Sequence, residues 1–523
     1  MGHTVSELEE QQAKRIAEVE ERNRLLEAEV RLLKQKLDAL IRIHFGSKSE
    51  KLDPGQLELL LGEDAAKKPD ASAGKILAPV DVDREDKSSK FAPNKERKPR
   101  IPEHLPLEEE ELIPDCVKAC PDAWKRISAE VISEQLDYRP ACFVRKRLIR
   151  PKYVRRSQRH DLAQAPITAP LPPRVVEGGL PTAGLLAQVL TAKYCDHLPL
   201  YRQEQIYRSR HGVDLPRQTL CRWVEQSAHL LEPVARAIHA EVFSSSHVQV
   251  DETVLKYISP GTKKTQHGYL WAARVPGDQG ATYYHWGPSR SHRVLLELVP
   301  ESYRGTLQSD GYGAYQTFIG KRPEVDLAAC WAHARRKFKE AFDAGESLER
   351  SGWILRQISH LYRIETKLRL ARAGPALREA NRRSESRMIA TRLQRALVRL
   401  QSRHLPQSYL GKAISYALGQ WKGLMLPFEN GHLEIDNNQV ENAIRPTKLG
   451  MKNWLFIGRE EAGWQAAVIY TILANCKQQG LEPWAYLKEV LETLPAIRSH
   501  EVPVWTPRAL ARQRRLLQTK QAS

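Results

Sequence analysis

Three acidic residues stand in local patterns that could bring carboxylates together around divalent metal ions. Asp251 lies in an alternating apolar and polar segment, Asp310 opens an Asp-Gly turn, and Glu441 lies on an amphipathic segment. Cleaving a phosphodiester requires charge neutralisation at phosphorus and an activated oxygen nucleophile, and two Mg²⁺ or Mn²⁺ ions roughly 4 Å apart supply both effects. Mg²⁺ prefers a few carboxylates together with water and substrate phosphate. The three acids are therefore candidate metal ligands and catalytic residues for phosphoryl transfer.

Each acid also has an ordinary structural interpretation. Asp251 could be a turn residue at a strand end, and an Asp-Gly pair such as the one at Asp310 is common in hairpins. Glu441 lies four residues before Arg445, which is the spacing of a helix ion pair. The separations between the acids are 310 − 251 = 59 and 441 − 310 = 131 residues. Spacing alone does not decide between these interpretations.

The segments around the acids predict strands and helices that could position them. Alternating apolar residues predict strands over His247–Ile258, Gly268–Val275, Ala281–Trp286, Gly305–Asp310 and Leu327–Trp331. A helix is predicted from about Ala332, and a further helix, with Asp436 or Asn437 as its N-cap, buries Val440 and Ile444 and carries Glu441. Strands followed by helices indicate an α+β or α/β core. Mostly helical sequence over 346–430 predicts an insertion before the third acid.

The first segment has a heptad pattern. Apolar residues and one Asn alternate in steps of three and four, at Ile16, Val19, Asn23, Leu26, Val30, Leu33, Leu37 and Leu40. β-branched residues at position a with Leu at d favour two parallel strands, and a buried Asn fixes their register. Residues 1–53 are therefore predicted to form a homodimeric coiled coil, the alternative being one amphipathic helix. The Pro-, Lys- and Ser-rich stretch 54–107 is predicted to be a flexible linker.

Residues 108–170 are predicted to form a small β-rich module. Cys116 and Cys120 could be half of a zinc site, but a structural site normally needs four ligands and no second pair follows; only Cys142 and His160 remain. Ordinary thiols are the alternative. The module also contains a basic run without acids, which could contact a DNA backbone or simply be a solvated face. Its members are Arg145, Lys146, Arg147, Arg150, Lys152, Arg155, Arg156 and Arg159.

Other basic residues are candidates for DNA contact. The formal net charge of the chain is +18, which favours a polyanionic partner. Residues 175–240 are predicted to be helical, with helices over Leu198–Arg210 and Gln218–Leu231 separated by a turn at Gly212. A helix-turn-helix would expose Arg217, Gln218 and Arg222 on its recognition helix, whereas a plain helical hairpin would not use them. Arg445, Lys448 and Lys452 follow Glu441 and could hold phosphates or be surface charge, and His333 and Arg335 could lie near the site.

Composition excludes some classes of protein. The sequence has no run of about 18 apolar residues and no signal-peptide pattern, so we expect neither a membrane partner nor secretion. Its seven scattered cysteines fit a reducing cytoplasm better than a disulfide framework.

Several longer strings resemble one family of bacterial proteins. They are FGSKSEKLDPGQLEL (45–59), KYCDHLPLYRQEQI (193–206), VQVDET (248–253), LQSDGYGAY (307–315), CWAHARRKF (330–338), EIDNNQVENAIRP (434–446), KNWLFIG (452–458) and ANCKQQGLEPWAYL (474–487). These strings and their order along the chain resemble the large transposase of the insertion sequence 66 (IS66) family over nearly the whole chain.

The resemblance implies a DDE transposase with an RNase H-like core. It implies a core over 241–345 and 431–478, interrupted by the helical insertion and followed by a basic helical tail over 479–523. It also implies catalytic, Mg²⁺-binding roles for Asp251, Asp310 and Glu441. Family members usually carry two CxxC pairs in the small module, whereas this chain keeps only a CxxxC at Cys116, which puts zinc in doubt.

The expected reaction cuts double-stranded DNA at the element's ends and joins the 3′-hydroxyl to a target. Accessory proteins of the same element and a nucleoid-associated, cytoplasmic location in a bacterium are expected with it. Two alternatives are an RNase H-like nuclease that only hydrolyses DNA and a catalytically silent DNA-binding protein or regulator.

Overall fold

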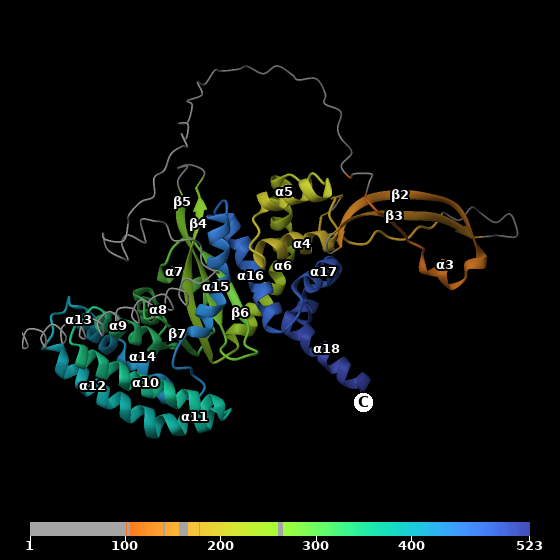
Figure 1. The fold of residues 1–523 in the computed structure, drawn as a ribbon. Coiled ribbons are helices and arrows are strands. Elements are labelled where there is room, and N and C mark those ends of the chain that lie inside the picture. Colours follow the sequence, from red (N-terminus) through yellow and green to blue (C-terminus); the bar gives the residue numbers. More distant parts are fainter. Residues whose placement is uncertain are drawn as a thin grey trace, which may run out of the picture. The chain divides into compact units, whose positions relative to one another are not determined.

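The computed structural model describes residues 101, 105–139, 142–155, 166–176, 178–259 and 265–522 (Figure 1). The chain divides into two units, Met1–Pro93 and Asn94–Ser523, and every described residue belongs to the second unit. The coiled coil predicted over 1–53 and most of the linker predicted over 54–107 lie outside the described residues and stay predictions.

A five-stranded mixed sheet positions two of the three candidate acids. Its strands are β4 (His247–Ile258), β5 (Thr265–Arg274), β6 (Thr282–Gly287), β7 (Thr306–Ser309) and β8 (Asp326–Ala329). They lie in the order β6-β5-β4-β7-β8. β5 is antiparallel to β4 and β6, whereas β7 is parallel to β4 and β8. All five predicted strands are confirmed close to their predicted bounds, and the fold is of the mixed α/β kind.

Helices cover both faces of this sheet (Figure 1). They are α7 (His292–Leu298) and α8 (Gly313–Lys321) on one face, and α15 (Asn438–Trp454) and α16 (Glu461–Gln478) on the other. Val248, Val250 and Leu255 of β4 are fully buried between these layers. Burying each such side chain contributes about 1.5–3 kcal/mol to folding, which makes β4 a rigid support for the residues beside it.

Neighbouring acids on β4 face opposite layers. Asp251 aligns across β5 with Tyr284, whose hydroxyl donates to the carbonyl of Ala443 in α15 at 2.6 Å. Glu252 points the other way and accepts a hydrogen bond of 2.7 Å from the hydroxyl of Tyr315 in α8. This follows from the period of two along a strand. Asp251 is thereby turned toward the layer that contains α15.

The segment 346–430, predicted to be a helical insertion, consists mostly of helices, and it shares a hydrophobic core with Trp331 and Phe338 of the preceding helix. Its elements are α10 (Leu348–Leu370), α11 (Pro375–Asn381), η3 (Arg382–Ser386), α12 (Arg387–Gln401), α13 (Tyr409–Gly419), α14 (Trp421–Met425) and η4 (Leu426–Phe428). It follows α9 (Trp331–Asp343), and the Trp331 indole donates to the Leu424 carbonyl at 2.8 Å. A buried ion pair of 2.7 Å joins Arg382 to Glu365 within it.

The segment predicted to be a small β-rich module contains a three-stranded sheet, and its identity as a DNA-binding module stays a prediction. It contains β1 (Leu107–Glu111), α3 (Asp115–Ala119), η2 (Pro121–Ala123), β2 (Trp124–Arg139) and β3 (Cys142–Arg155). The three strands lie in the order β1-β3-β2, with β1 parallel and β2 antiparallel to β3. β3 is thus the central strand.

Helices connect this module to the large sheet. They are α4 (Ala183–Tyr194), α5 (Leu200–His211) and α6 (Arg217–Phe243), joined by the C-terminal elements α17 (Pro483–Thr493), η5 (Leu494–Ala496), η6 (Ser499–Trp505) and α18 (Pro507–Ala522). The predicted turn at Gly212 is confirmed, since this residue ends α5 with a positive φ of 64°. The predicted end of the next helix at Leu231 is wrong. α6 continues through Pro233 because its apolar stripe stays buried at Val234, Ile238 and Val242. Among the described residues, no helix is long and apolar enough to cross a membrane.

Candidate active site

Asp251 stands on the central strand β4, and its carboxyl is largely desolvated. Desolvation raises the pKa of Asp251 to about 7, helped by the negative charges of Glu252, Asp310 and Glu441. The backbone N–H of Glu252 opposes this rise. Three acids that are 59 and 131 residues apart in sequence therefore act on one another in the fold. Converging carboxylates raise each other's pKa because each disfavours the charge of the next.

Asp310 follows β7 directly and is held by a tight turn. Its Oδ1 accepts a hydrogen bond of 2.9 Å from the Tyr312 amide, and Gly311 between them has a φ of 80°. Its Oδ2 lies 3.5 Å from a guanidinium nitrogen of Arg290. Because β7 is the parallel neighbour of β4, its end lies beside Asp251.

Glu441 lies in the first turn of α15, and β4 determines where that helix begins. The Gln249 amide donates to the Asp436 carbonyl at 2.7 Å and accepts from the Val440 amide at 3.3 Å. Val440 is fully buried, as predicted. Asn437 occupies the N-cap position but its side chain forms no cap; instead, Asp436 accepts from the Asn438 amide at 3.2 Å.

The Glu441 carboxylate has an unused acceptor. Its Oε1 is buried and has no hydrogen-bond partner. His333 lies 3.6 Å from this oxygen and Arg336 lies 4.0 Å from the other. Desolvation lowers the pKa of His333, and the nearby Glu441 opposes this. His333 is near the site as predicted, whereas the neighbouring cation is Arg336 and not Arg335, because the helical turn of α9 aims the later residue at Glu441.

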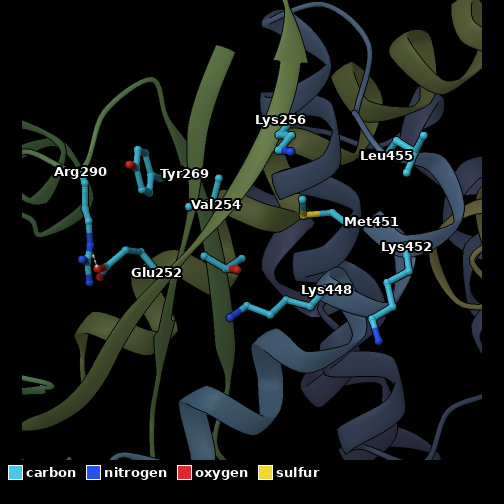
Figure 2. Close-up of a pocket in the computed structure, with 10 residues that line it drawn as sticks. Glu252, Val254, Lys256, Tyr269, Arg290, Lys448, Met451, Lys452 and Leu455 are labelled. Carbon is cyan, nitrogen blue, oxygen red and sulfur yellow. Dashed lines mark hydrogen bonds and ion pairs between the residues drawn. The ribbon is translucent and has the colours of Figure 1, made fainter. Parts of the chain in front are cut away.

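Sequence reasoning missed Glu252 and Arg290. The Arg290 guanidinium forms an ion pair with Glu252 (Figure 2). It also lies over the ring of Tyr312, 3.7 Å from its centre. Arg290 therefore bridges a fourth, buried acid and Asp310. Glu252 could have been suspected from its place beside Asp251, but nothing in the pattern around Arg290 singles it out.

The donor set fits divalent magnesium with substrate present. Within the described residues, no three His, Cys, Asp or Glu side chains are grouped closely enough to hold one metal ion by themselves. Mg²⁺ typically takes only one or two carboxylates, with waters and phosphate oxygens completing its shell. The mutual repulsion at Asp251 and the unpartnered Glu441 oxygen are features that a cation would relieve.

Three members of the predicted basic run on β3 pair with acids from the neighbouring strands. Arg147 contacts both Glu134 of β2 at 2.8 Å and Glu109 of β1 at 3.1 Å. Arg145 also contacts Glu134, and further pairs join Lys146 to Glu110 and Arg150 to the Ala169 carbonyl. These acids come from β1 and β2, which the run itself does not reveal. Lys152 and the backbone of Arg155 belong to β3, while Arg156 and Arg159 lie outside the described residues.

The other predicted DNA contacts lie on two helices. Arg217, Gln218 and Arg222 are exposed in the first turns of α6, in agreement with the predicted placement. Arg445, Lys448 and Lys452 are exposed on α15, the helix of Glu441. Their contact with DNA stays a prediction.

The cysteines of the small module form no metal site among the described residues. Cys116, Cys120 and Cys142 are exposed free thiols, and His160 lies outside the described residues. Zinc binding there remains untested.

Comparison with known proteins identifies the relatives of the chain. Residues 178–465 match the family model described as transposase IS66 family, and residues 32–109 match one described as transposase C of IS166 homeodomain. The chain is similar to an uncharacterized protein of Sinorhizobium fredii, y4jD, with 34% identity over 90% of this chain and 91% of the relative. It is also similar to y4qI of the same organism, with 34% identity over 74% and 72% of the two chains. A third relative there, y4hP, is 27% identical over 90% and 88%.

Proposed function

Because the chain belongs to the transposase IS66 family, we propose that it is a DDE transposase that cleaves DNA at the ends of an insertion sequence. In this proposal the released 3′-hydroxyl is then joined to target DNA. The family match supports the transposase role, and the homeodomain match over 32–109 suggests a DNA partner. The coiled-coil homodimer, accessory proteins and nucleoid association remain predictions.

We assign the five-stranded sheet and its helices to an RNase H-like core. The strand order β6-β5-β4-β7-β8, with a central strand between an antiparallel and a parallel half, supports this assignment. The positions of the acids support it too, since one lies on the central strand, one after its parallel neighbour and one on a helix after the insertion.

Asp251, Asp310 and Glu441 would hold two Mg²⁺ ions, which when bound neutralise charge at the scissile phosphate and activate the attacking oxygen. The protein itself positions the carboxylates. Gln249 fixes the start of α15 and so aims Glu441, while the Tyr312 amide orients Asp310. Both acids are thereby fixed before DNA arrives, which lowers the cost of assembling the site.

One arrangement supports the proposal: Asp251 lies on β4, and Asp310 follows the parallel neighbour β7. Glu441 lies in the first turn of α15, and Gln249 of β4 is hydrogen-bonded to the start of that helix. A fold that only bound DNA would gain nothing from gathering carboxylates beside a basic helix, because they repel phosphate. Arg445, Lys448 and Lys452 on α15 would hold the DNA backbone next to these acids.

The proposal is tested with the full-length protein on DNA that carries the element's ends. We expect Mg²⁺-dependent cleavage of the wild-type substrate, and joining of pre-cut ends to a target. Asp310→Asn should abolish cleavage while DNA binding stays near the wild-type level. The matched control is Asp326→Asn, which changes an exposed acid at the start of β8.

Three results would contradict the proposal in different ways. Cleavage without joining of pre-cut ends would indicate a nuclease. DNA binding without any cleavage would indicate a silent DNA-binding protein. If Asp310→Asn cleaved DNA as fast as the wild type, the assignment of Asp310 as a Mg²⁺ ligand would be wrong.

A further inference from the structure

The central strand has an open edge beside the candidate acids. On the side away from β5, pairing of β4 with β7 ends at Gln249. Pairing resumes only near the end of β4, where the Ile457 amide donates to the Lys256 carbonyl at 2.9 Å and the Ile258 amide to the Gly458 carbonyl at 2.7 Å. Among the described residues, no strand covers the edge between these points.

A cavity of about 630 Å³ lies along this edge, between β4 and α15 (Figure 2). Four cations line it, namely Lys256, Arg290, Lys448 and Lys452, with Glu252 as the one lining acid. Figure 2 shows Lys448 extending from α15 toward β4, and Arg290 held by Glu252 on the opposite side. The charge of the lining complements phosphate.

Apart from Thr253, the rest of the lining is largely apolar, which a site for a DNA backbone alone does not require. Val254 and Tyr269 contribute from the sheet, and Met451 and Leu455 from α15. A mixed lining of this kind, apolar with a few charged groups, is typical of sites that enclose an organic ligand. An aromatic ring together with cations is typical of sites for unpaired nucleotides.

A strained turn after α15 contributes Leu455 to the lining of the cavity. Leu455 has φ 57° and ψ −40°, which is a rare combination for a residue with a side chain, and the Phe456 amide donates across it to the Trp454 carbonyl at 2.5 Å. The turn leaves Leu455 67% and Phe456 39% exposed. Strained backbone that presents two large apolar side chains to water destabilises the free protein, and such strain concentrates at functional sites.

The cavity lies on the same helix face as the third acid. Lys448 follows Glu441 by one heptad on α15, a spacing that repeats nearly the same direction on a helix, and Leu455 comes directly after the helix ends. At 1.5 Å per residue, Lys448 is about 10 Å beyond Glu441, which corresponds to about three nucleotides of one DNA strand. A strand cleaved at the acids would therefore reach the cavity within a few nucleotides.

We propose that this cavity binds an unpaired nucleotide of the DNA strand next to the cleavage position, and that Leu455 and Phe456 separate the base pair from which it comes. The proposal rests on the proposed function. Arg290 and Lys448 contact the phosphates of the unpaired nucleotide, and the apolar wall receives its base. A base inside a duplex is stacked and paired, so only a displaced base can enter. Apolar side chains inserted at a base step supply the displacement.

The test compares two short duplexes with the element's terminal sequence, both bound by full-length protein in EDTA so that no cleavage occurs. One is fully paired and the other has its last two base pairs mismatched. Each carries 2-aminopurine near the end, whose fluorescence rises when it unstacks. We expect the wild-type protein to bind the mismatched duplex about tenfold more tightly, because no free energy is needed to separate its terminal base pairs. We also expect the protein to raise the fluorescence of the paired duplex.

The wedge variant changes Leu455→Ser and Phe456→Ser together. Its matched control changes Leu516→Ser and Leu517→Ser, two adjacent exposed leucines on α18. We expect the wedge variant to lose the fluorescence rise on paired DNA and still to bind the mismatched duplex more tightly than the paired one. If the double variant melts early, Leu455→Gly provides the second test, since Gly tolerates the positive φ.

The outcomes separate this inference from the proposed function. Equal affinity of the wild-type protein for the two duplexes, or an unchanged fluorescence rise in the wedge variant, would overturn the cavity assignment even if the protein cleaves DNA. Conversely, a preference for mismatched ends without any Mg²⁺-dependent cleavage would support the cavity and contradict the transposase mechanism.

Discussion

The buried amide of Gln249 offers a direct way to disturb the site without touching an acid. Its side chain is fully buried and joins three elements. The amide nitrogen donates to the Asp436 carbonyl at 2.7 Å and to the Gln308 side chain at 2.9 Å, and the oxygen accepts from the Val440 amide at 3.3 Å. We predict that Gln249→Leu shifts the start of α15 and misplaces Glu441.

The magnitude follows from the groups left unpaired. Leu has nearly the same volume as Gln, so packing changes little, and the Val440 amide keeps its second hydrogen bond, to the Asn437 carbonyl at 3.1 Å. The Asp436 carbonyl loses its buried donor, which costs about 1–3 kcal/mol for the region around the site. A displacement of Glu441 by about 1 Å would slow cleavage by about 100-fold.

Two measurements check this prediction. Chemical denaturation gives the loss in the free energy of unfolding. Single-turnover cleavage, with the protein in excess over the DNA and above the dissociation constant, gives the loss in cleavage rate. Gln316→Leu is the control, because this glutamine is exposed on α8 and its loss should change both quantities little. If Gln249→Leu cleaved DNA at the wild-type rate, Gln249 would not position Glu441. If its unfolding midpoint were unchanged, the lost hydrogen bonds would not carry the stability assigned to them.

Three further predictions concern charge. Because the pKa of Asp251 is raised to about 7 from an ordinary value of 3.8, the folded metal-free protein binds an extra proton between these values. Its stability should therefore fall by about 4 kcal/mol as pH rises from 4 to 7, and Asp251→Asn should remove this pH dependence in denaturation experiments in EDTA. Glu365→Ala leaves Arg382 buried without its acid, and we expect a loss of about 3–5 kcal/mol confined to the helical insertion, measurable by hydrogen exchange. Lys448→Gln should reduce the slope of log affinity against log salt by about 0.9, whereas Lys422→Gln, a lysine of the insertion, should leave the slope unchanged.

Much of the sheet could be predicted because its signals are local. The alternation of apolar and polar residues around Val248 and Val250 predicts strand β4. The apolar pair Val440 and Ile444 predicts the helix that carries Glu441. The same local reasoning ended α6 too early at Leu231. A proline removes one hydrogen bond, but burial of the following turns compensates for it, and burial depends on contacts that a sequence window does not contain.

The electrostatic partners could not be predicted because they come from distant segments. The cation beside Asp310 is Arg290, which lies at the start of another element, and the acids that pair with Arg147 come from both neighbouring strands. Register decides such pairs, since a shift of one residue turns every side chain to the other face. The basic run of the small module therefore has less free charge than its sequence indicates.

The difference between Asp251 and Glu252 has the same origin. They are adjacent acids in one motif, and without the family resemblance the local pattern alone gives no reason to prefer either as a metal ligand. The strand turns them to opposite faces, where Glu252 accepts from the Tyr315 hydroxyl and pairs with Arg290. Asp251 instead faces α15, whose Glu441 oxygen lacks a donor. A carboxylate whose lone pairs already accept hydrogen bonds from protein donors has few free lone pairs to coordinate a cation. The hydrogen bonds therefore favour Asp251 as the ligand and Glu252 as the residue that holds Arg290 in place.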